Sequence, residues 1–111
     1  MNIDLKMNID EILYVQKLIE LTRTVYIIHQ NQNKKFIFSI VLDIGQKINK
    51  KASSLDEILS SVTKKKYKIK FKFHEAIILE RFLIDVQQTE NDPFNLNLAR
   101  SIISQLNQKM A

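Results

Sequence analysis

The densest group of chemically active side chains in this sequence lies at positions 64–72, which read KKKYKIKFK. The segment contains six lysines and no acidic residue, and it carries the positive excess of a chain whose formal net charge is +5 at pH 7. Clustered ammonium groups bind the phosphates of a nucleic-acid backbone or the carboxylates of an acidic protein surface. The candidate contact residues are Lys64, Lys65, Lys66, Tyr67, Lys68, Lys70 and Lys72.

Apolar and cationic residues alternate from Tyr67 onward, which is the period of a β-strand. We expect a strand over residues 67–73 whose apolar side chains face a core, namely Tyr67, Ile69, Phe71 and Phe73. A second role competes with binding, because lysines also protect exposed edge strands from aggregation and keep proteins soluble. The sequence favours that role over contact with a nucleic acid, since sequence-specific readers rely on arginine and this chain has three.

His74 and Glu75 have the side-chain types of a metal or acid–base site, but the surrounding sequence argues against one. A helical zinc site needs a second histidine four positions later, and position 78 is isoleucine. The chain has no cysteine, and its single glycine, Gly45, is too few for a phosphate-binding loop. We therefore expect no enzymatic activity, no metal and no cofactor.

The amino-terminal third predicts a strand followed by a long helix. Residues 2–7 alternate in the strand sense. Asn8 and Glu11 then have the spacing of a capping box, which opens a helix that we expect to run through about residue 30. Its apolar residues cover a wide arc, so we expect neighbours on several sides. The apolar residues of this arc are Ile12, Tyr14, Val15, Leu18, Ile19, Leu21, Val25, Tyr26 and Ile28.

The remainder of the chain predicts four more helices and no boundary between domains. Asp92 is the expected N-cap of the last helix, with Pro93 at its first position. The expected helical ranges are 36–50, 55–63, 75–88 and 93–109. The predicted fold is a single mainly α domain (α+β) over residues 1–111, with about five helices and a minor two-stranded β element at about residues 2–7 and 67–73.

Two features of the sequence allow alternatives. Residues 35–42 contain a β-like run but lie in a helical pattern with Gly45 near its middle, and we expect a helix there. The tetrapeptide MNID occurs twice, so Met1 and Met7 are alternative starts, and with Met7 the first strand would be dispensable.

Apolar residues outside the main helical stripes are candidates for a protein interface. Ile77 and Ile84 lie seven positions apart on the far side of their predicted helix. Phe38 and Leu42 are candidates of the same kind on the predicted helix at 36–50. Such a ridge is either buried inside the domain or binds a partner, and a homodimer is one form of that partner.

Together these features predict a small basic binding protein with no membrane span and a cytoplasmic location. The leading hypothesis is a non-enzymatic protein that regulates or inhibits a larger complex by direct contact. That complex is a protein or a protein–nucleic acid assembly, and the analogy is to phage and mobile-element inhibitors of CRISPR effectors (anti-CRISPR-like proteins). One alternative is a protein that binds DNA or RNA directly through residues 64–72, and a second is a structural or assembly protein.

Overall fold

The computed structural model describes residues 2–26, 32–55 and 65–111, and the side chains of residues 23–38 are outside that description. The described part is a compact, mostly helical α+β fold with four helices and one two-stranded antiparallel sheet. The elements are β1 (Asn2–Asn8), α1 (Ile9–Tyr26), α2 (Gln32–Ser53), β2 (Lys66–Lys72), α4 (Phe73–Thr89) and α5 (Pro93–Met110). The predicted helix at 55–63 falls almost entirely outside the described residues.

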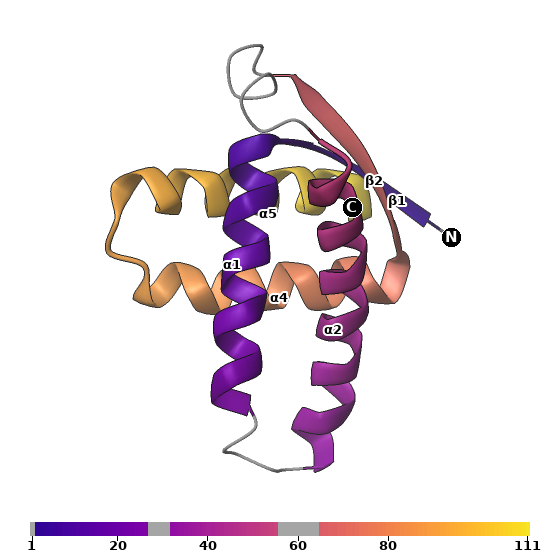
Figure 1. Cartoon of the computed structure of the whole chain (residues 1–111), viewed down its shortest axis with the longest axis vertical. Coiled ribbons are helices and arrows are strands. Elements are labelled where there is room, and N and C mark those ends of the chain that lie inside the picture. Colours follow the sequence, from indigo (N-terminus) through magenta and orange to yellow (C-terminus); the bar gives the residue numbers. More distant parts are fainter. Residues whose placement is uncertain (1, 27–31, 56–64) are drawn as a thin grey trace.

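The helices form two antiparallel pairs that cross each other. Figure 1 shows α1 and α2 side by side, with α4 and α5 crossing behind them. The sheet lies where β2 leads into α4, and the connection between α4 and α5 lies at the opposite end of those two helices. None of the helices in the described ranges is long and apolar enough to cross a membrane.

The two strands pair in a register that places all their apolar residues on one face. Leu5 lies opposite Ile69, and Ile3 lies opposite Phe71. These four side chains are buried against the helices, as the alternation predicts. The prediction for Phe73 is wrong: this residue is the first of α4 rather than part of the strand, and its side chain is 37% exposed.

The core lies between the sheet and both helix pairs. Its largest fully buried side chains are Phe71, Leu5, Met7, Ile12, Ile44, Ile48, Leu79, Leu83, Ile102, Leu106 and Val15. Gly45 lies where α2 passes α1 closely, because a Cβ at this position would stand 3.0 Å from Cγ2 of Ile19. The glycine therefore allows an approach that compensates for its low helix propensity.

Local signals at the helix starts agree with the sequence. The Asn8 side chain accepts a hydrogen bond from the Glu11 amide at 2.8 Å, and the Glu11 carboxylate accepts one from the Asn8 amide at 3.0 Å. Asp92 accepts a hydrogen bond from the amide of Phe94. The helix prediction for residues 35–42 is confirmed, but α2 begins earlier than expected, at Gln32.

Candidate functional site

The outer face of the sheet is densely cationic. Lys6, Lys66, Lys68, Lys70 and Lys72 are all exposed there, and Asp4 is the one carboxylate that the two strands contribute. Lys68 lies opposite Lys6 in the register, and its ammonium group is 3.5 Å from the Asp4 carboxylate. Exposed pairs of this kind contribute little to stability, so most of this charge remains available to a partner.

The lysines of α2 extend this cationic face beyond the sheet. The last part of α2 lies along β2, and the Lys47 ammonium donates to the backbone carbonyl of Lys70 at 3.3 Å. A shallow hollow of about 380 Å³ separates the two elements. Its lining is Lys47, Lys50, Lys51, Ser54, Lys68, Ile69 and Lys70. Helix and strand thus present ammonium groups to the same space, which residues 64–72 alone could not reveal.

Lys47 differs from the other lysines because it is part of the scaffold. Its ammonium group forms a 2.6 Å ion pair with Glu75, whose side chain is only 4% exposed. The same Glu75 oxygen accepts the Lys72 amide at 2.7 Å and so caps the start of α4. Glu75 therefore joins α2, β2 and α4 behind the cationic face.

The Glu75 carboxyl is ionised by its partners despite its burial. Burial alone would raise its pKa, but the hydrogen bonds from Lys47 and the Lys72 amide outweigh burial and hold the pKa below the ordinary value of 4.5. A folded-state pKa below the unfolded one means that the interaction stabilises the fold above the unfolded-state pKa. This contribution is lost as the pH falls through the folded-state pKa.

Lys47→Met should therefore reduce stability in a pH-dependent way. At pH 7 we expect a loss of about 1–3 kcal/mol, because Glu75 would remain buried without its cation. The loss should shrink as the pH falls through the folded-state pKa of Glu75, because protonation removes the buried charge. Urea unfolding over a series from pH 7 into acid measures it, with Lys50→Met as the exposed control on the same helix. A loss that stays constant over the whole range in which the protein is folded would show that the effect is packing alone.

Tyr67 is a supporting residue of the cationic face. Its side chain is half-buried, and the ammonium groups of Lys51 and Lys65 lie 6.0 Å and 5.7 Å from its ring centre. Cation–π attraction of this kind draws the two lysines towards the amino-terminal end of β2. Among the predicted contact residues, Lys64 lies outside the described part of the chain.

The apolar ridge predicted from the sequence is only partly exposed. Ile77 and Leu42 are half-buried, and Ile84 is 39% exposed. The side chain of Phe38 lies outside the description. His74 is exposed, and no group of three or more metal-ligating side chains occurs among the residues described here.

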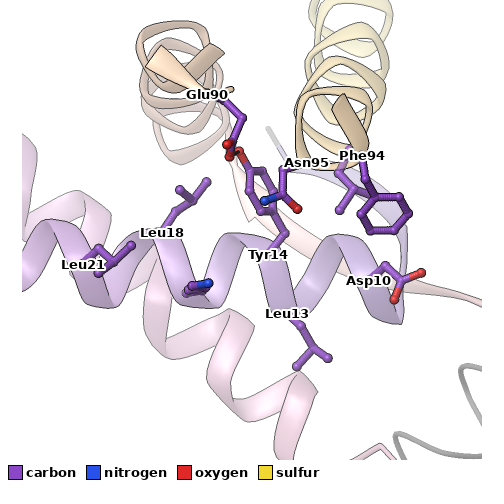
Figure 2. A pocket seen from close by; sticks show the side chains of 10 residues that line it. Asp10, Leu13, Tyr14, Leu18, Leu21, Glu90, Phe94 and Asn95 are labelled. Carbon is purple, nitrogen blue, oxygen red and sulfur yellow. Dashed lines mark hydrogen bonds between the residues drawn. The ribbon is translucent and has the colours of Figure 1, made fainter. Parts of the chain in front are cut away.

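A more exposed apolar surface lies where α1 meets the start of α5, and the helical pattern of the sequence does not indicate it. Leu21, which the helical pattern assigns to the buried arc, is 56% exposed, and Phe94 is 59% exposed. Both line an open groove of about 380 Å³ (Figure 2). Its other lining residues are Asp10, Leu13, Tyr14, Lys17, Leu18, Glu90, Asn95 and Leu98. We call it the α1–α5 groove.

A hydrogen bond fixes the floor of the α1–α5 groove. The buried Tyr14 donates its hydroxyl proton to Glu90 at 2.9 Å. Burial and this hydrogen bond raise the pKa of Tyr14. The Tyr14 hydrogen bond, together with the Asp92 amide, lowers the pKa of Glu90. The Glu90 carboxylate thus accepts hydrogen bonds from groups of its own chain.

Fold and surface together define a small α+β domain with a cationic face on its sheet and an apolar groove between α1 and α5. Comparison with known proteins adds no relative, because no family model, curated protein or solved structure matches the chain.

Proposed function

We propose that this protein is a non-enzymatic binding protein whose cationic face contacts the phosphate backbone of a nucleic acid. The observation that supports this most is the convergence of α2 and β2 on one lysine-lined hollow next to the lysines of the sheet. Lysines that only protected a strand edge would not need a second set from a helix. The proposal concerns the face as a unit rather than the segment 64–72 alone.

The dimensions of β2 suit an extended polyanion. Alternate residues on a strand are about 6.6 Å apart, so the outward lysines from Lys66 to Lys72 span about 20 Å. Along a duplex with one phosphate per 3.4 Å of rise on each strand, that length passes about six phosphates of a strand. Several ammonium groups can therefore meet phosphates at the same time.

Lysine chemistry makes this contact independent of base sequence. A lysine is a hydrated point charge on a flexible stem, whereas bidentate recognition of guanine is mainly the task of arginine. Among the described residues, every cationic side chain at the hollow and on the outer face of the sheet is a lysine. We therefore propose backbone recognition, which positions a protein on nucleic acid without selecting a site.

The cellular role we propose is regulation or inhibition of a larger nucleic-acid-handling complex in the cytoplasm, as anti-CRISPR-like proteins of phage act. Occupying a phosphate backbone denies it to the positively charged channel of another protein. A second candidate is contact between the same face and an acidic protein surface, favoured by the same excess of charge.

Binding to labelled DNA over a series of salt concentrations tests the proposal. If five lysines meet phosphates, the plot of log affinity against log salt should have a slope of roughly −4.5 for a duplex, at about 0.9 per contact. Unrelated sequences should bind with similar affinity. Absence of binding at low salt, combined with capture of an acidic protein that survives nuclease, would replace this proposal by the second candidate.

A further inference from the structure

The α1–α5 groove has a chemistry unlike that of the cationic face. Its exposed apolar anchors, Leu21 and Phe94, are the two most exposed of the large apolar side chains in the described part of the chain. In Figure 2, Phe94 lies near Asp10 at one end of the groove, and Leu21 lies at the other end. Exposed aromatic and aliphatic anchors around a groove are typical of the centre of a protein interface.

The charges of the groove are balanced and arranged along α1. Asp10 and Lys17 are two helical turns apart and thus lie on the same side of the helix. Both are exposed and both line the groove, while Glu90 is engaged by Tyr14 and the Asp92 amide. One free carboxylate and one free ammonium group remain, so the groove suits neither a strongly basic nor a strongly acidic partner.

We infer that the α1–α5 groove is the self-complementary interface of a homodimer. A two-fold axis through the groove exchanges its two ends and runs the two α1 helices antiparallel. Phe94 of one copy then meets Leu21 of the other, and Asp10 meets Lys17, twice in each dimer. The same patch thus supplies both the apolar anchors and the opposite charges that it requires.

The inferred dimer leaves the cationic face free. The groove is lined by residues of α1, of the connection between α4 and α5, and of α5, and none of its lining residues belongs to the sheet. In Figure 1 the α4–α5 connection lies at the end of α4 opposite the one where β2 leads into that helix. Two copies would therefore present two cationic faces, so the inference goes beyond the proposed function and can succeed or fail independently of it.

Charge exchange across the inferred axis gives a specific test. We would measure the mass in solution of Lys17→Glu, Asp10→Lys and their equimolar mixture by sedimentation over a concentration series. Each variant alone places like charges together twice, and we expect its self-association to weaken roughly 10-fold or more. The mixture should recover dimers, because every contact then joins opposite charges. A mixture that associates no better than its components, or variants that dimerise like the wild type, would overturn the inference.

Removal of the apolar anchors tests the same interface independently of charge. We expect Phe94→Ser and Leu21→Ser each to shift the protein to monomer, and Ile84→Ser, an exposed apolar residue on α4 outside the groove, to leave the dimer intact. Circular dichroism establishes that each variant is folded. A wild-type protein that stays monomeric at every concentration would contradict the inference and leave the groove to another partner.

Discussion

Replacing Lys68, Lys70 and Lys72 together by glutamate is expected to abolish nucleic-acid binding while the protein remains folded. Three lost phosphate contacts should reduce the magnitude of the salt slope by about 2.7. If the affinities converge near 1 M salt, this difference corresponds to roughly 500-fold weaker binding at about 0.1 M. Repulsion between the new carboxylates and the phosphates weakens binding further.

The fold should tolerate this triple exchange because all three side chains point into solvent. The like-charged pair of Lys6 and Lys68 becomes an attractive pair, while Asp4 loses its ion pair with Lys68 and gains repulsive neighbours at positions 68 and 70. Each such pair contributes about 0.2–1 kcal/mol, so the net loss is expected to be small beside the stability of the whole fold. Circular dichroism before and after urea unfolding measures this loss.

A matched control separates the cationic face from the total charge. The variant Arg81→Glu, Arg100→Glu and Lys109→Glu also changes the net charge from +5 to about −1, but its three positions are exposed sites on α4 and α5. We expect it to bind far more tightly than the β2 variant. If both lose affinity equally, binding follows net charge rather than the face. If the β2 variant binds as the wild type does, the lysines serve edge protection or solubility.

Removing residues 1–6 should produce the largest loss of stability. The deletion takes away the buried side chains of Ile3 and Leu5 and leaves β2 without most of its partner. Burial of each side chain stabilises by about 1.5–3 kcal/mol, and the whole domain is expected to have only 5–15 kcal/mol. Urea unfolding should therefore show a protein that is barely folded or unfolded.

Single substitutions in the same strand provide the comparison. Leu5→Ala should cost about 2–5 kcal/mol, because its side chain is fully buried. Lys6→Ala should change stability by no more than about 0.5 kcal/mol, since its side chain is exposed. An unchanged unfolding midpoint after the deletion would show that Met7 is a sufficient start and that β1 is dispensable.

The sequence predicted those parts of the structure that depend on local chemistry. The pairing of residues 2–7 with the lysine-rich strand was expected and is present. The capping box of Asn8 and Glu11 and the cap at Asp92 also follow from side chains three positions apart or fewer. Such features need no knowledge of distant neighbours, so a single sequence contains them.

Features that arise from packing could not be predicted in this way. The pattern that assigned Leu21 to the buried arc is correct in period, but among the described residues no other element covers that part of α1, so the side chain is exposed. Phe73 follows the alternation of its strand, but α4 begins there, and the strand geometry ends one residue early. The approach of Lys50 to Lys70 depends on how α2 lies along β2, which no local signal encodes.

The pairing of β1 with β2 has a consequence for the order of events during synthesis. Leu5 leaves the ribosome before its partner Ile69, which follows only after about 60 further residues and therefore roughly 3–12 s later at 5–20 residues per second. During this interval α1 and α2 can already form, because helices need only local contacts. β1 thus remains without its partner until β2 has been made, and the cationic face is completed only when the nascent chain has grown beyond Lys72.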